Sequence, residues 1–177
     1  MVYFNSKYDI IFSVENYEAY SLYTFKFKDS KSKGFIAECN IRLVTDPLSK
    51  KSTEEDKINF QNKCSSIDED FKAASEAIIS HSDFANESNE TFYSGIIDRM
   101  FVNEDFRRKG IGSEILQNLP EIFLRCYNIK LKQLVLINVP DLSSTHSIKE
   151  MDEITTNFYI KNGYRKCKGC FYQFIRY

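Results

Sequence analysis

The sequence lacks any long apolar run: no stretch of its 177 residues approaches the ~20 consecutive apolar residues that cross a bilayer. Its opening residues, MVYFNSKYD, also lack the basic region, apolar core and small-residue cleavage site of a secretory signal. We therefore expect a soluble, cytoplasmic protein with no membrane partner. In that reducing compartment the five cysteines are expected to be thiols.

An excess of either charge is missing as well. The chain has 24 Lys and Arg residues against 25 Asp and Glu residues, which gives a formal net charge of -1. This balance provides no general attraction for nucleic acid, so no nucleic-acid partner is expected and any anion binding must be local.

Two common nucleotide-binding motifs are also absent. No GxxxxGK[ST] phosphate loop occurs, and GIGSEI (residues 110–115) lacks the third glycine of the dinucleotide fingerprint. What is present is a local basic stretch, FRRKGIGSEIL (residues 106–116), in which a helix is predicted to begin near Gly110. The first turn of a helix has N–H groups without intrahelical partners and a positive dipole end, so anions bind there.

The residue types in this stretch suit a pyrophosphate. Gly110 and Gly112 remove side chains where a diphosphate would approach the backbone. The other polar residues add a hydroxyl or positive charge, and these are Arg107, Arg108, Lys109 and Ser113. The alternative is a basic turn whose glycines only provide backbone freedom.

The residue patterns divide the chain into three zones. Residues 8–44 are aromatic and β-branched, which predicts two or three antiparallel strands. Residues 46–89 are polar and predict two helices, one within TEEDKINFQNKC (53–64) and one from about Asp68 with Ser66 as a possible cap. From Gly95 onward the pattern is strand, turn, helix, strand, loop, helix and a final hairpin. The length suits a single domain, residues 1–177.

The first unit of the third zone is SGIIDRMFV (94–102), a strand in which Ile96, Asp98, Met100 and Val102 are expected to share one face. The helix that follows contains Pro120, which removes a hydrogen bond and is expected to kink or restart it.

Three ordered motifs in this zone resemble the GNAT superfamily of acyl-CoA-dependent N-acyltransferases. Residues 107–112, RRKGIG, match the family's pyrophosphate loop of Arg or Gln, two residues, Gly, one residue, and Gly or Ala. NFYIKNGY (157–164) is similar to the family's FYxxxGF, and KQLVLINV (132–139) fits the strand that splays from the first. The resemblance covers residues 95–177, and residues 1–94 carry no motif.

The resemblance implies an α+β GNAT fold: a mixed, mostly antiparallel sheet with a splayed parallel pair of strands and flanking helices. It implies acetyl-CoA as co-substrate, no metal, and a possible homodimer. Asp152 stands where the family commonly has an Asn, so a coenzyme contact would differ there. The expected coenzyme-binding residues are Met100, Phe101, Val102, Arg107, Arg108, Lys109, Gly110, Ile111, Gly112, Ser113, Asn138 and Asp152.

The resemblance also suggests catalytic residues. Tyr159 stands where many family members carry the general acid that protonates the coenzyme A sulfur; the alternative is a packed aromatic residue. Asp98 is a candidate base or anchor for a cationic acceptor; the alternative is an ion pair with Arg99 or Arg42. His146 ranks lower as a base because nothing fixes its geometry.

Cys167 and Cys170 admit a metal or redox interpretation, but a structural zinc site needs four ligands. We interpret Lys168 and Gly169 between them as a hairpin turn.

The expected function is therefore transfer of an acetyl group from acetyl-CoA to a primary amine, by direct transfer in a ternary complex. Two alternatives remain: a non-catalytic acyl-CoA-binding or sensing module, and an acetyltransferase that modifies a lysine or N-terminus of another protein. The sequence names no acceptor.

Overall fold

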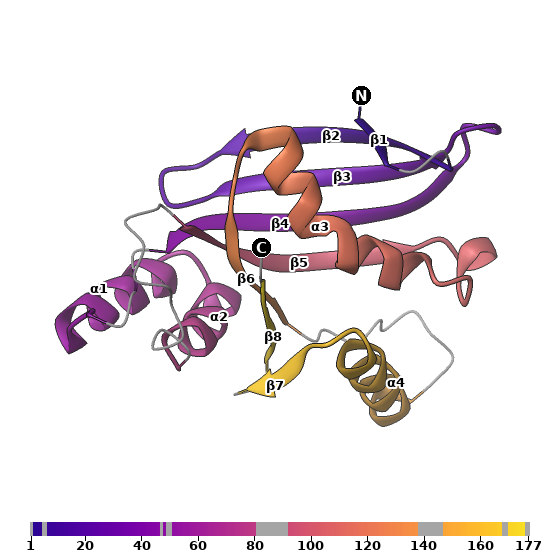
Figure 1. The fold of residues 1–177 in the computed structure, drawn as a ribbon. Coiled ribbons are helices and arrows are strands. Elements are labelled where there is room, and N and C mark those ends of the chain that lie inside the picture. The colour runs from indigo at the N-terminus through magenta and orange to yellow at the C-terminus, as the bar shows by residue number, and fades with distance from the viewer. Residues whose placement is uncertain are drawn as a thin grey trace.

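The computed structural model describes residues 2–4, 7–46, 48, 51–80, 92–137, 147–167 and 170–175. Its strands form one eight-stranded sheet in the order β1-β2-β3-β4-β5-β6-β8-β7. Helix α3 crosses one face of this sheet, while α1 and α2 lie side by side at one end and α4 lies beside β7 (Figure 1). Among the described residues, no helix combines the length and apolar character that a membrane span requires.

The first half of the sheet is an antiparallel meander. It consists of β1 (Val2–Phe4), β2 (Tyr8–Asn16), β3 (Ser21–Asp29) and β4 (Phe35–Asp46). Each strand pairs with the next along the chain. The strands predicted between residues 8 and 44 are therefore confirmed as β2, β3 and β4.

Both predicted helices of the polar zone are present, as α1 (Glu54–Ser65) and α2 (Glu69–Ser80). Thr53 and Asp56 form a capping box at the start of α1. The predicted cap of α2 was wrong: Ser66 ends α1, and Asp68 Oδ1 instead accepts a 2.7 Å hydrogen bond from Phe71 N at the start of α2. A side chain at Asp68 is two positions closer to the free N–H groups of the first turn.

The second half contains the elements predicted from Gly95 onward. They are β5 (Phe92–Val102), a short 3-10 helix η2 (Glu104–Phe106), α3 (Ile111–Tyr127), β6 (Leu131–Ile137), α4 (Ile148–Lys161), β7 (Arg165–Cys167) and β8 (Cys170–Phe174). β5 and β6 are parallel, whereas every other pairing in the sheet is antiparallel. The expected mixed, mostly antiparallel sheet with one parallel pair is confirmed.

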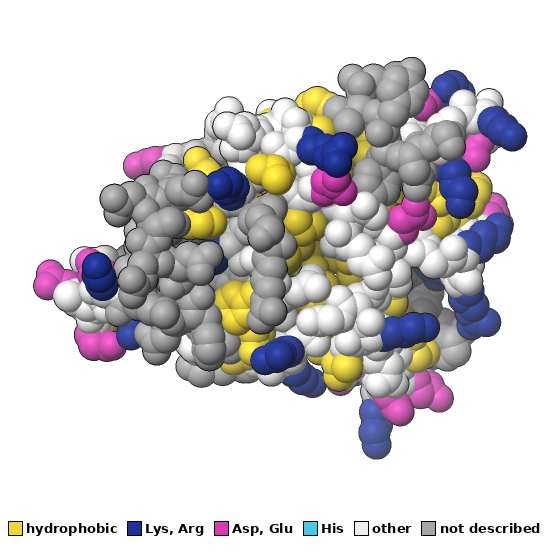
Figure 2. Space-filling view, viewed as in Figure 1, with side chains coloured by type: hydrophobic (Ala, Val, Ile, Leu, Met, Phe, Trp, Pro, Cys, Tyr) yellow, Lys and Arg dark blue, Asp and Glu magenta, His cyan; other side chains and the backbone are white. Residues whose placement is uncertain are grey.

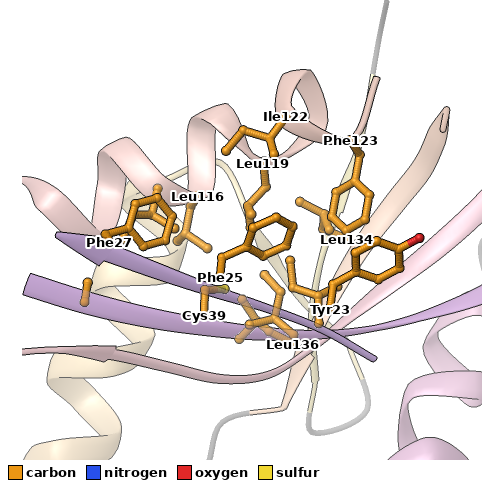
Figure 3. Close-up of a cluster of buried hydrophobic side chains, with 14 of the residues drawn as sticks. Tyr23, Phe25, Phe27, Cys39, Leu116, Leu119, Ile122, Phe123, Leu134 and Leu136 are labelled. Atoms are coloured by element: carbon orange, nitrogen blue, oxygen red, sulfur yellow. The ribbon is translucent and has the colours of Figure 1, made fainter. Parts of the chain in front are cut away.

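The larger hydrophobic core lies between α3 and the sheet. Leu116, Leu119, Ile122 and Phe123 of α3 point toward side chains of the strands (Figure 3). The strand residues labelled there are Tyr23, Phe25, Phe27, Cys39, Leu134 and Leu136. We call this cluster the first core.

The first core explains why Pro120 does not interrupt α3. The helix is continuous from Ile111 to Tyr127 with Pro120 inside it. Of the expected kink or restart, the restart was therefore wrong, and the kink stays a prediction. A proline costs a helix interior about 3 kcal/mol. Burying a large apolar side chain recovers about 1.5–3 kcal/mol, and α3 buries such residues on both sides of the proline.

A second core lies under α1 and α2. Phe60 and Cys64 of α1 and Phe71 and Ile78 of α2 pack there with Ile96 of β5, together with Val135, Cys170 and Tyr172. The two halves of the sequence therefore share this core.

The strand face predicted for β5 was wrong because the strand contains a bulge. On β4, Asn40 pairs with Arg99 while the adjacent Ile41 pairs with Ile97, so Asp98 is the extra residue. Ile96 lies in the second core, whereas Met100 packs against the first core. A bulge places one additional residue in a strand and thereby reverses the alternation beyond it.

Candidate functional site

β5 and β6 separate in the middle of the sheet. Their pairing runs from Tyr93 with Leu131 to Ile97 with Leu136, and β5 then continues to Val102. Within the described part of the chain, no strand pairs with the β6 side of residues 98–102. The two strands then diverge in direction (Figure 1). This open edge carries three of the expected coenzyme-binding residues, Met100, Phe101 and Val102, each half-buried.

The turn from β5 into α3 presents consecutive free N–H groups. Arg108 has φ of 60° and Gly110 has φ of 81°, both in the left-handed region. Gly110 is the N-cap of α3 and provides no side-chain cap. Within the described part of the chain, none of the N–H groups from Arg108 to Ser113 donates a hydrogen bond. Helix starts of this kind and turns with alternating left-handed residues form anion-binding concavities.

The three basic side chains of this turn have different roles. Arg107 Nε donates a 3.0 Å hydrogen bond to Val102 O, and Lys109 Nζ donates a 2.7 Å bond to Asp105 O. These two side chains therefore hold the turn in place. Arg108 is exposed and has no ion pair or hydrogen bond in the described part of the chain, so it remains available to an anion. Basic side chains gather over this end of the molecule (Figure 2).

The sequence does not indicate the second role of Gly112. A Cβ at this position would lie 3.1 Å from Phe158 Cζ on α4 and 3.6 Å from Met100 Cε on β5. The absence of a side chain thus lets the first turn of α3 approach both neighbours. Gly112 brings α3, α4 and the open part of β5 together.

Tyr159 lies next to this junction, on the first-core side of the sheet. Its ring contacts Phe158, Tyr164 and Phe171 at centroid distances of 5.3, 6.1 and 5.2 Å. Burial, and secondarily the nearby thiol of Cys39, raises the pKa of Tyr159 to about 12. Its hydroxyl makes no hydrogen bond within the described part of the chain. The Tyr159 hydroxyl therefore keeps its proton at neutral pH.

Asp98 lies on the other side of the sheet. It is the first residue of β5 beyond the last pair with β6. Its Oδ1 lies 2.8 Å from Arg42 Nη2, and Arg42 Nη1 also pairs with Asp68 at the start of α2. The Arg42 guanidinium lies over the ring of Phe71, 5.1 Å from its centroid. Of the two ion-pair partners considered for Asp98, the structure shows Arg42.

Tyr159 and Asp98 therefore flank the separation of the strands from opposite faces. Tyr159 packs against the first core, and Asp98 is linked to the first turn of α2 above the second core.

The other residues predicted for the site add little to its described geometry. Asp152 is exposed on α4. Asn138, His146 and the expected turn residues Lys168 and Gly169 lie outside the described residues. Cys167 and Cys170 pair directly across β7 and β8 as free thiols, which confirms the predicted hairpin arrangement of these strands. Within the described ranges, no group of three His, Cys, Asp or Glu residues is placed to hold a metal ion.

Sequence reasoning missed two contributors to the site. Asp68 links Arg42 to α2 by an ion pair, and Phe158 packs against Gly112. Asp68 precedes Phe71 by three residues, which is the spacing of a helix cap, so the sequence did contain a signal for it. The contact between Phe158 and Gly112 joins segments that are distant in the chain, and the sequence contained no signal for it.

Comparison with protein-family models finds one match, to the acetyltransferase (GNAT) domain, over residues 69–166. The matched range contains α2, β5, the β5–α3 turn and Tyr159. No curated protein sequence matches the chain.

Among solved structures, the chain resembles NAA60 of Arabidopsis thaliana in complex with acetyl-CoA, with 13% identity, coverage of 86% of this chain and 76% of that one, and a TM-score of 0.49. It also resembles AtaT in complex with acetyl-methionyl-tRNAfMet (6%, 86% and 71%, TM-score 0.45) and a KacTA–DNA complex (7%, 89% and 69%, TM-score 0.46). The bound nucleic acids belong to those proteins. The expected lack of a nucleic-acid partner stays a prediction for this chain.

Proposed function

Because the chain belongs to the GNAT acetyltransferase family and is a GNAT-type acyltransferase, we propose that it transfers an acetyl group from acetyl-CoA to a primary amine. The transfer would be direct, with both substrates bound together. The observation that carries this proposal is the open edge of β5 beyond Ile97, which ends at the run of free N–H groups from Arg108 to Ser113.

The diphosphate of coenzyme A suits the β5–α3 turn. The N–H groups at the start of α3 have no protein acceptor in the described residues, and a diphosphate provides acceptor oxygens with negative charge. Arg108 supplies the available cation, while Arg107 and Lys109 hold the turn in shape. Ser113 adds a hydroxyl in the first turn of α3.

The pantetheine arm suits the open edge of β5. Residues 98–102 present main-chain groups on the side that β6 has left, and an amide-containing arm can pair with such an edge as a strand would. N–H groups between Met100 and Val102 are then placed to donate to the thioester carbonyl. Asn138, which follows Ile137 in the sequence and lies outside the described residues, and Asp152 on α4 are proposed as further coenzyme contacts.

Acetyl-CoA supplies an acyl group on a good leaving group, so the protein needs to orient the amine and manage two protons. We assign acceptance of the ammonium proton to Asp98, directly or through water. Tyr159 donates its hydroxyl proton to the departing sulfur. Their positions on opposite faces of the sheet allow the amine to enter from the α2 side while the coenzyme occupies the gap between the strands.

Helices α1 and α2 would cover the acceptor. Asp68 at the start of α2 reaches the Asp98 carboxylate through Arg42, so the acceptor side of the site includes this helix. The second core, which joins α1 and α2 to β5, β6 and β8, supports residues 1–177 as one domain.

Thiol release from acetyl-CoA across a panel of polyamines, aminoglycosides, amino acids and peptides tests the proposal. We expect turnover with one class of primary amine and saturation by both substrates, with initial-rate patterns of a ternary complex. Tight acetyl-CoA binding without turnover on any amine would instead indicate a binding module. Turnover only with folded proteins would indicate a protein acetyltransferase.

A further inference from the structure

The outer edge of the sheet has an uncovered segment on β2. β1 pairs only with Tyr8–Ile10, and within the described part of the chain no strand pairs with the outer side of residues 11–16. Those residues are exposed on both faces of the strand. A strand edge of this kind presents a row of unpaired main-chain groups to solvent.

Apolar side chains concentrate on the same segment. Ile11, Phe12 and Val14 are 43%, 38% and 36% exposed, and Tyr17 in the following turn is 48% exposed. The other strongly exposed large apolar side chains among the described residues lie on α1 and α4, at Ile58, Ile154 and Ile160. The β2 segment is thus the one place in the described structure where these residues follow one another along the chain.

Several common protections against strand pairing are missing here, and Glu15 is the one charged residue of the segment. Residues 11–16, IFSVEN, contain no Pro, Lys or Gly. The pairing of β2 with β3 is regular along its whole length, so no bulge turns the edge away. Phe12 is held in an edge-to-face contact with Tyr127, with centroids 5.4 Å apart. The edge is regularly paired with β3 on its inner side and carries exposed apolar side chains.

We propose that this edge pairs with the same edge of a second copy of the chain, to form an antiparallel two-fold dimer with a continuous sheet. A two-fold axis at Ser13 places Ser13 opposite Ser13, Phe12 opposite Val14, and Ile11 opposite Glu15. The strand of the second copy then pairs with residues 11–15. These residues follow Ile10, the last residue of β2 that pairs with β1.

The side chains suit this register on both faces. Phe12 and Val14 pair with Phe25 and Tyr23 of β3, which belong to the first core, so the new contact extends an existing apolar layer. On the opposite face Glu15 meets the side chain of Ile11 rather than another Glu15, so no like charges are opposed. A net charge of -1 adds little repulsion between copies. In an isologous contact of this kind, the same edge of both copies is paired, so the unpaired main-chain groups of both copies gain partners.

The family match begins at residue 69, so β2 lies outside the matched domain. The dimer therefore does not depend on the proposed activity, and either can fail without the other.

Cysteine cross-linking tests the register. Opposite residues in an antiparallel pair have Cα atoms about 4.5–5.5 Å apart, within the range of about 4.4–6.8 Å that a disulfide spans. We expect Ser13→Cys to form a covalent dimer under mild oxidation. Glu15→Cys alone should not, but should cross-link when mixed with Ile11→Cys. The parent protein, with its native Cys126 and Cys167, is the background control. Equal cross-linking of Ser13→Cys and Glu15→Cys would reflect random collision and overturn the register.

Sedimentation equilibrium tests whether the β2 edge forms the dimer interface. The parent is expected to dimerise with rising concentration, and Val14→Lys to raise the dimer dissociation constant at least tenfold. Ile58→Lys, which makes the same kind of change on α1, should leave it unchanged. A parent that stays monomeric at about 100 μM and is not cross-linked through Ser13→Cys would overturn the proposal. So would a dimer that Val14→Lys does not weaken, or an edge that binds only strands of other proteins.

Discussion

Arg42 Nη2 on β4 lies 2.8 Å from Asp98 Oδ1 on β5, at the point where β5 leaves β6. The same guanidinium pairs with Asp68 and is largely buried, with 17% of the side chain exposed. One carboxylate oxygen of Asp98 therefore pairs with Arg42, and Asp68 at the start of α2 pairs with the same guanidinium. The two carboxylates share one partner but have different positions relative to the open strand edge, which makes them a matched pair for experiments.

Asp98→Asn is expected to lower kcat by roughly 10²- to 10⁴-fold, the usual contribution of a positioned acid or base. Asp68→Asn removes the other carboxylate from Arg42 but retains an effective helix cap, since Asn and Asp are similar in that role. It should retain kcat within about threefold, in keeping with a role outside the chemistry. Steady-state kinetics and thermal unfolding of both variants decide the matter. Equal loss of activity in the two would make Asp98 a structural ion-pair partner.

Tyr159→Phe is expected to lower kcat by roughly 10- to 1000-fold with acetyl-CoA affinity nearly unchanged, because only the transferable proton is removed. Tyr164→Phe is the matched control: its hydroxyl is buried without a hydrogen-bond partner in the described residues, so its removal should not reduce activity. Single-turnover kinetics and calorimetry separate chemistry from binding. Unchanged chemistry in Tyr159→Phe would reduce Tyr159 to a packing residue.

The pH dependence of kcat provides a further check on Tyr159. Since burial raises its pKa to about 12, the hydroxyl keeps its proton throughout the neutral and mildly alkaline range. Loss of the acid should therefore lower kcat only as pH approaches 12. An alkaline limb centred near pH 9 that disappears in Tyr159→Phe would contradict the burial of this side chain.

Arg108→Glu should weaken acetyl-CoA binding by roughly 10- to 100-fold, as expected for loss of a hydrogen bond to a charged group of about 1.5–3 kcal/mol. Arg125→Glu makes the same charge change in the last turn of α3, where the side chain is 76% exposed, and should have little effect. Calorimetry at two salt concentrations is the measurement. Similar losses in both variants would indicate a general charge effect rather than a diphosphate contact.

The stability of the fold should decrease at alkaline pH because of Cys39. Burial raises the pKa of this fully buried thiol from 9.0 to about 12. The unfolded chain releases the thiol proton first, so the stabilising contribution is complete below pH 9 and is lost as pH rises toward 12. At pH 10, about one unit above the ordinary thiol pKa, the expected loss is on the order of 1 kcal/mol. Urea unfolding at pH 7 and 10 measures it, and Cys39→Ala should show a smaller difference between the two. An equal difference would assign the effect to other groups.

Local pattern was sufficient for much of the fold. Hydrophobic alternation located β2, β3 and β4, and helical spacing located α1 and α2. The glycines and charges of residues 107–113 identified the turn whose free N–H groups the structure shows. These features depend on residues close together in the chain.

The errors involve distant partners. The bulge at Asp98 depends on how β5 pairs with β4, so the sequence of β5 alone predicts the wrong face for Met100. Pro120 breaks isolated helices, but the burial of α3 against the sheet outweighs its cost. The choice of Arg42 over Arg99 as partner of Asp98 likewise depends on strand register. For these features, tertiary contacts decide between local alternatives.

The order of the strands has a consequence for how the chain folds. From β1 to β4 each strand pairs with its neighbour in sequence, so these pairings close short loops and cost little chain entropy. Pairing of β5 with β4 requires closure across α1 and α2, and the parallel β5–β6 pair requires closure across α3. The meander should therefore form first and serve as the template on which β5 is added. Pulse-labelling hydrogen exchange during refolding should show protection of β3 amides before those of β5 and β6, so that the strand edge assigned to acetyl-CoA is among the last parts of the sheet to be completed.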